Sequence, residues 1–283
     1  MTNGSARFGR KIIGYTPDGK QVYANDLSSE AFGEILLQKD PADGICNICL
    51  KEFSALSEEH VPPKCTGNRG RYRFISYLNF MTDSSTKPLG FSQNGIKYRT
   101  VCTECNNITL KHCDDAISEL FNPFLDDNIS QEQFGVSYRP NLVIRGILGH
   151  FLSAKTSHVR STTEDLFVRA LQNMSDPIPE QLGFYVLPYT LPEIRIVRDL
   201  LLVVNSSPTL FNVMKVYPFA FIVTSERVFA PFPNWHEYFE LNPDSYVRLE
   251  PLNSNPVRCG WPENSGAQVL GLHAAQSVIA FPA

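Results

Sequence analysis

The sequence predicts an α+β fold in two parts: a metal-braced N-terminal unit followed by a mixed α/β C-terminal domain. Two Cys-x-x-Cys pairs and a local excess of Lys and Arg characterise the first part. After about residue 135 the chain changes to apolar runs of strand length, separated by prolines, and to segments with helical spacing. We therefore predict an N-terminal region at residues 1–130 and a C-terminal domain at residues 131–283.

The composition is that of a packed globular protein. The chain has 283 residues, of which 43% are hydrophobic and 11% aromatic. It contains no apolar run of the length that a membrane-spanning helix requires. The first residues, MTNGSARFGRKIIGY, lack the apolar core of a signal peptide. We expect a cytoplasmic protein whose cysteines are reduced.

The N-terminal region is expected to alternate short strands with helices. Residues 12–24 have alternating apolar residues around a Pro-Asp-Gly turn, which predicts a hairpin. Residues 28–39 have helical spacing after a serine N-cap. Residues 66–99 are expected to form loops with a short hairpin. The strand at 96–102 then leads into a helix at 105–122, which ends before Pro123.

The C-terminal domain is expected to contain both helices and strands around a core of its own. Helical spacing covers residues 140–155 and 161–174, the second with a capping signature at Thr162 or Thr163. His150 and His158 lie in or near these helices and are interpreted as structural. The strand-like runs are 182–188, 193–205, 212–225 and 244–251.

Four cysteines predict a zinc site. In a protein with reduced thiols, paired Cys-x-x-Cys units indicate a metal site rather than disulfides. A closed tetrahedral set of four thiolates is typical of structural zinc. The alternative is two unrelated pairs of buried thiols. The predicted Zn²⁺ ligands are Cys46, Cys49, Cys102 and Cys105.

Between the cysteine pairs, the segment EEHVPPKC places Glu59 and His60 next to a rigid Pro62-Pro63 pair. A neutral imidazole can accept a proton from water near pH 7, and a carboxylate can hold Mg²⁺. Adjacent residues of a strand point to opposite sides, so the pair needs a bend to act together. The alternative interpretation of His60 is an ordinary surface histidine.

Asn106 follows the second cysteine pair at the start of a predicted helix. Its amide oxygen is a suitable Mg²⁺ ligand, whereas the alternative role is a helix cap. The nearby basic residues are predicted to contact a nucleic-acid backbone without sequence specificity, unless they only form a solvated loop. These basic residues are Lys64, Arg69, Arg71 and Arg73.

The order Cys-x-x-Cys, Glu-His-x-x-Pro, Cys-x-x-Cys-Asn resembles the HNH endonucleases of the ββα-metal (His-Me finger) superfamily, over a core at residues 44–115. The resemblance implies a zinc-braced ββα unit that hydrolyses phosphodiester bonds in DNA. It implies His60 as general base and Glu59 and Asn106 as ligands of a catalytic Mg²⁺ or Mn²⁺. The family's middle Asn, which steadies the loop bearing the base, corresponds to Asn79 or Asn94.

Two other functions remain open at the level of sequence. One is a nuclease directed at RNA, and the other is a zinc-braced module that binds nucleic acid or protein without cutting it. Stand-alone HNH proteins with an extra domain resemble bacterial defence or mobile-element nucleases. That resemblance implies a sensing, targeting or regulatory role for residues 131–283, through which a partner protein or signal would act.

Overall fold

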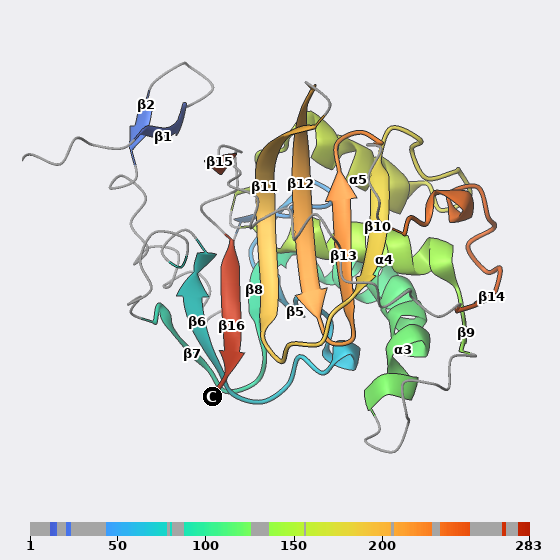
Figure 1. The fold of residues 1–283 in the computed structure, drawn as a ribbon, viewed down its shortest axis with the longest axis horizontal. Coiled ribbons are helices and arrows are strands. Elements are labelled where there is room, and N and C mark those ends of the chain that lie inside the picture. Colours follow the sequence, from blue (N-terminus) through green and yellow to red (C-terminus); the bar gives the residue numbers. More distant parts are fainter. Residues whose placement is uncertain are drawn as a thin grey trace, which may run out of the picture.

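The computed structural model describes most of the chain and shows helices packed against one face of a large β-sheet (Figure 1). This arrangement confirms the predicted combination of α and β structure. Within the described residues, no helix is both long and apolar enough to cross a membrane. The described residues are 12–15, 21–23, 44–77, 80, 88–125, 136–155, 157–204, 207–227, 233–249, 268–269 and 277–283.

The large sheet has eight strands in the order β10-β13-β12-β11-β16-β6-β7, with β15 also paired to β11. All of these pairings are antiparallel. The strands are β10 (Gly183–Pro188), β13 (Phe219–Thr224), β12 (Ser207–Val216), β11 (Ile194–Val204), β16 (Val278–Pro282), β6 (Tyr72–Ser76), β7 (Gly90–Ser92) and β15 (Gln268–Val269).

This sheet joins the two predicted parts of the chain. Strand β16 pairs with β11 on one side and with β6 on the other, so that Ile279 lies opposite both Arg195 and Ile75. The main apolar core likewise contains residues from Cys46 to Ala280. The predicted C-terminal core is not separate, because β6 and β7 extend the C-terminal sheet and Tyr72 and Phe74 of β6 belong to the same apolar core. The predicted boundary near residue 130 lies outside the described residues.

Four two-stranded sheets complete the β structure. The predicted N-terminal hairpin is confirmed, and the other pairs lie near the cysteines or at the α3 side of the molecule (Figure 1). The pairs are β1 (Ile12–Tyr15) with β2 (Gln21–Tyr23), β3 (Gly44–Ile45) with β4 (Glu52–Phe53), β5 (Ser57–His60) with β8 (Lys97–Val101), and β9 (Ser137–Tyr138) with β14 (Val247–Arg248).

The helices differ from the prediction in two details. Helix α3 continues through Pro123, and the nearby Phe121 and Phe124 both pack edge-on against Phe219. Ser161, one residue before the predicted positions, caps α5 through a capping box with Glu164. The predicted helix at 28–39 lies outside the described residues. The helices are η1 (Lys64–Thr66), η2 (Cys105–Leu110), α3 (Lys111–Leu125), α4 (Pro140–Ser153), α5 (Thr162–Gln172) and η3 (His236–Tyr238).

Candidate metal centres

The first cysteine pair lies in a tight turn between β3 and β4. The Cys46 amide donates to the Lys51 carbonyl at 2.9 Å, and the Leu50 amide donates to the Cys46 carbonyl at 2.9 Å. Leu50 has a φ of 58°, in the left-handed region that a leucine rarely adopts. This turn brings the sulfurs of Cys46 and Cys49 to the same side of the hairpin.

The second pair lies where β8 passes into η2, and it meets the first pair. The Sγ atoms of Cys46, Cys49, Cys102 and Cys105 all lie within 4.8 Å of one another. The Sγ atoms of Cys49 and Cys102 are 3.9 Å apart. Tetrahedral ligands with Zn–S bonds of about 2.3 Å are separated by about 3.8 Å, so the four cysteines can bind a metal such as zinc.

The local electrostatics also fit a cation at this position. Backbone amides donate to two sulfurs: Cys102 N–H to Cys46 Sγ at 3.3 Å and Cys105 N–H to Cys102 Sγ at 3.4 Å. A hydrogen bond from Cys105 lowers the pKa of Cys46 to about 4, and the same bond raises the pKa of Cys105. Cys46 and Cys105 thus share a proton, and a bound cation would favour the thiolate form of both.

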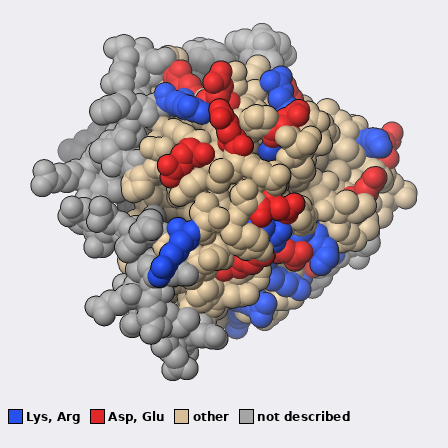
Figure 2. All heavy atoms as spheres, turned by 90° about the vertical axis from the view of Figure 1, so that its right-hand side faces the viewer, with Lys and Arg blue, Asp and Glu red and all other residues tan. Residues whose placement is uncertain are grey.

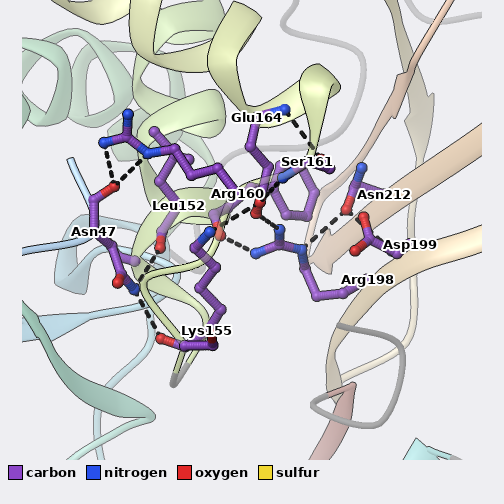
Figure 3. A network of polar contacts seen from close by, with 12 residues as sticks. Asn47, Leu152, Lys155, Arg160, Ser161, Glu164, Arg198, Asp199 and Asn212 are labelled. Carbon is purple, nitrogen blue, oxygen red and sulfur yellow. Dashed lines mark hydrogen bonds and ion pairs between the residues drawn. The ribbon is translucent and has the colours of Figure 1, made fainter. Parts of the chain in front are cut away.

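The cysteine hairpin is tied to the end of α4 through Asn47. The side-chain amide of Asn47 donates to the carbonyls of Leu152 (3.1 Å) and Lys155 (2.9 Å), as Figure 3 shows. The Arg160 guanidinium donates to the Asn47 carbonyl at 2.8 Å. The four-cysteine site is therefore fixed to the helical layer as well as to β8.

Asn106 lies beside the strand segment that carries Glu59. The Asn106 side-chain amide donates to the Glu58 carbonyl at 3.2 Å and to Ser57 Oγ at 3.1 Å. Glu59 lies in β5 opposite Tyr98 of β8 and is 6% exposed. Burial raises the pKa of Glu59 to about 7, so that a nearby cation would favour its ionised form.

The imidazole of His60 is also buried, at 8% exposure. Its Nε2 lies 3.1 Å from the Asn94 carbonyl oxygen. Burial and the positive charges of Lys64 and Lys97 lower the pKa of His60 to about 4. His60 is therefore neutral at pH 7, which is the protonation state that a general base requires.

Asn68, which the sequence analysis did not select, braces the loop after His60. Its side chain donates to the carbonyls of Pro62 (2.6 Å) and Ile96 (3.1 Å), and its Oδ1 accepts from the Ile96 amide at 2.8 Å. Asn94 contributes only its carbonyl to His60, and Asn79 lies outside the described residues. The one signal available in the sequence was the position of Asn68 in the glycine-containing segment GNRG, residues 67–70, which follows the Pro62-Pro63 pair.

A second group of metal-ligating side chains joins Glu59 to two residues that sequence reasoning did not assign to a site. Ligand atoms of Glu59, Asp114 and His150 all lie within 4.8 Å of one another. His150 Nε2 lies 2.7 Å from Asp114 Oδ1, and its Nδ1 lies 3.8 Å from Glu59 Oε1. His150 comes from α4, far from the motif in the chain, so no local pattern indicated this contact.

The four predicted nucleic-acid contacts, Lys64, Arg69, Arg71 and Arg73, are exposed. The guanidinium groups of Arg71 and Arg73 lie over the rings of Phe91 and Phe281, at 5.3 and 5.5 Å from the centroids. Figure 2 shows the opposite side of the molecule, where α3 and β14 lie; there Lys, Arg, Asp and Glu are interspersed. A polyanion would thus find mixed charge on that face.

The chain was compared with family models, with curated proteins and with solved structures, and none of them matches it.

Proposed function

We propose that this protein is a metal-dependent endonuclease of the HNH kind, which hydrolyses phosphodiester bonds in DNA. The observation that carries the proposal is the contact of Asn106 with the β5 segment that bears Glu59 and His60, next to the four-cysteine cluster. Asn106 is the residue that follows the second cysteine pair, and it donates to the carbonyl of Glu58, the residue before Glu59 and 48 positions earlier in the chain.

Each motif residue has a distinct role in this proposal. His60 accepts the proton of the attacking water, and its neutral state at pH 7 suits that role. The carboxylate of Glu59 and the amide oxygen of Asn106 would hold Mg²⁺ or Mn²⁺. That ion supplies positive charge to the phosphate and to the departing 3′ oxygen. Asn68 keeps the loop after His60 in place through its contacts with Pro62 and Ile96.

Basic residues beside this segment are suited to binding the nucleic-acid backbone. Lys64 lies in η1, four residues after His60, and Arg71 and Arg73 lie at β6. All are exposed, and their charges attract phosphates of any sequence. Residues 131–283 would sense a partner or signal, or target the nuclease. A nuclease unit joined to such an additional region resembles the bacterial defence and mobile-element nucleases.

A second candidate function is a zinc-braced module that binds nucleic acid or protein without cutting it. The exposures of Glu59 (6%) and His60 (8%) favour it, because a scissile phosphate must reach both groups. An RNA-directed nuclease shares the first mechanism and differs only in its substrate.

The test is cleavage of supercoiled plasmid with Mg²⁺ or Mn²⁺, comparing wild type with His60→Ala. We expect a loss of about 10²–10⁴-fold in the nicking rate, which is the usual effect of removing a general base. His158→Ala is the matched control, because His158 is exposed and lies outside the motif. Equal nicking by wild type and His60→Ala would contradict the mechanism. Binding of DNA without nicking by either protein would favour the non-cutting module, and cleavage of RNA alone would favour the RNA nuclease.

A further inference from the structure

The Nδ1 atom of His150 is a buried polar atom with no hydrogen-bond partner among the described residues. The side chain is 0% exposed, and it belongs to α4, which packs against both α3 and α5. Its other ring nitrogen, Nε2, is within hydrogen-bond distance of Asp114 Oδ1, at 2.7 Å. Buried polar atoms in proteins are nearly always partnered, so an unpartnered one requires an explanation.

The position of Nδ1 supplies one. The nearest carboxylate oxygen is Glu59 Oε1 at 3.8 Å, which is too far for a hydrogen bond. Two ligand atoms that each lie about 2.1 Å from one cation are separated by about 3.0 to 4.2 Å, depending on the ligand–metal–ligand angle. The gap between His150 Nδ1 and Glu59 Oε1 is therefore the size that a shared metal ion needs.

Asp114 completes a known kind of arrangement around such an ion. A metal-bound histidine usually donates its second ring N–H to a carboxylate, which fixes the tautomer and the orientation of the ring. A neutral ring with its proton on Nε2 facing Asp114 would present the lone pair of Nδ1 to Glu59 and to a cation between them. Asp114 is a partly exposed residue of α3, so the cluster has a side toward solvent.

We propose that His150 Nδ1 and Glu59 Oε1 bind a divalent first-row transition-metal ion, with Asp114 as the positioning residue of His150. If this ion is the nuclease's metal, His150 joins Glu59 and Asn106 as a ligand, and in that respect the proposal rests on the proposed function. Imidazole nitrogen combined with carboxylate oxygen favours ions such as Mn²⁺ over Mg²⁺, which prefers oxygen ligands only. Because His150 belongs to α4, residues 131–283 would then supply part of the metal site rather than only regulate it.

The experiment is a titration of the untagged full-length chain, with its cysteine-bound zinc in place, with Mn²⁺ under electron paramagnetic resonance. We expect one Mn²⁺ per chain, with the ¹⁴N modulation in the spin-echo signal that a coordinated imidazole produces. Asp114→Asn removes only the partner of a ligand and should weaken Mn²⁺ binding by about 10–100-fold. Glu59→Gln removes a ligand and should weaken it at least as much. Both substitutions preserve side-chain shape, and the zinc content of each variant reports that the fold is retained.

Glu58→Gln is the matched control, because Glu58 adjoins Glu59 but pairs with Lys97 and Arg99 at the surface. It should bind Mn²⁺ as wild type does. No saturable Mn²⁺ binding, bound Mn²⁺ without ¹⁴N modulation, or equal binding by Glu59→Gln and Glu58→Gln would each overturn the proposal. Mn²⁺ binding with intact plasmid would support the metal site and count against the nuclease. Metal-dependent cleavage by wild type, together with unchanged Mn²⁺ binding in Glu59→Gln, would support the nuclease and count against the metal site.

Discussion

The cysteine region and the large sheet achieve a fixed structure in different ways. Strands β3 and β4 have two residues each, too few to be stable through their own pairing. Strands β11 and β12 have 11 and 10 residues, and every residue of β13 is buried. The first region therefore depends on the four cysteines and on side-chain hydrogen bonds such as those of Asn47 and Asn68, whereas the sheet is stabilised by apolar burial along its length.

A buried polar network connects the two regions, and its residues are shown in Figure 3. Arg198 of β11 donates to Glu164 of α5 at 2.6 Å and to Asn212 of β12 at 2.9 Å. Lys155 donates to the second oxygen of Glu164 at 2.9 Å, and its carbonyl accepts from Asn47 in the cysteine hairpin. The comparison shows that a four-cysteine cluster able to bind a metal fixes one part and apolar packing fixes the other. Ion pairs of Glu164 and the hydrogen bond from Asn47 to the Lys155 carbonyl link the two.

The largest effect is expected from removing the zinc. Cys102→Ser, or a strong chelator, should destabilise the cysteine region by roughly 5 kcal/mol or more, because structural zinc contributes about 10–16 kcal/mol of apparent binding free energy. Metal analysis should show the loss of one zinc per chain, and hydrogen exchange should show lost protection in β3, β4 and β5 but not in β11 to β13. Cys65→Ser is the control, since Cys65 lies outside the cluster, and it should retain zinc. An equal loss of hydrogen-exchange protection in β11 to β13 would mean that the large sheet depends on the metal as much as the cysteine region does.

The next effect concerns the network between the regions. Glu164→Gln leaves the buried charges of Arg198 and Lys155 without their carboxylate, and breaking a buried pair in this way costs about 3–5 kcal/mol. Urea denaturation should show this loss while the zinc content stays unchanged. Asp165→Asn, on the next residue of α5 but largely exposed, should change the unfolding free energy by less than about 0.5 kcal/mol. A loss of zinc in Glu164→Gln would mean that the network, and not the cysteines, holds the hairpin.

A smaller effect is expected from acid on the sheet side. Burial and the nearby Arg227 lower the pKa of His236 from about 6.5 to about 4, and its Nε2 accepts a hydrogen bond from the Phe184 amide. The unfolded chain then binds the extra proton below pH 6.5, so this contribution to stability is complete above pH 6.5 and falls as the pH drops toward 4. The melting temperature of His236→Gln should fall less between pH 7 and pH 4.5 than that of wild type. His158→Gln, at an exposed position, should follow wild type; an identical pH dependence in His236→Gln would contradict the assignment.

The smallest effect concerns the basic surface at β6. Arg71→Ala should weaken DNA binding modestly and reduce the slope of log K against log salt by about one, because one phosphate contact is lost. Fluorescence anisotropy at several salt concentrations measures both quantities. Arg248→Ala, on β14 at the face with interspersed charges, is the control and should leave the slope unchanged. A similar change of the salt slope in Arg71→Ala and Arg248→Ala would mean that DNA does not bind preferentially at β6.

Local patterns in the sequence determined a good part of this protein. The Cys-x-x-Cys spacing predicted that four sulfurs would meet, since each pair fits one tight turn. Helical spacing predicted α4, and alternation with a turn predicted the β1–β2 hairpin. The motif order led to the prediction that Asn106 meets Glu59, and the Asn106 side chain donates to the carbonyl of the preceding residue, Glu58. These features depend on neighbours in the chain, which the sequence displays directly.

Only the tertiary structure decided which distant segments meet. Nothing near Ile279 in the chain indicates that β16 would lie between β6 and β11, because antiparallel pairing constrains the partner strands and not their separation in sequence. His150 likewise follows the helical pattern of α4, and its contacts with Asp114 and Glu59 arise from the packing of α4 against α3 and β8. The residue types at the site could be read from the sequence, whereas the set that shares one point in space depends on how the layers pack.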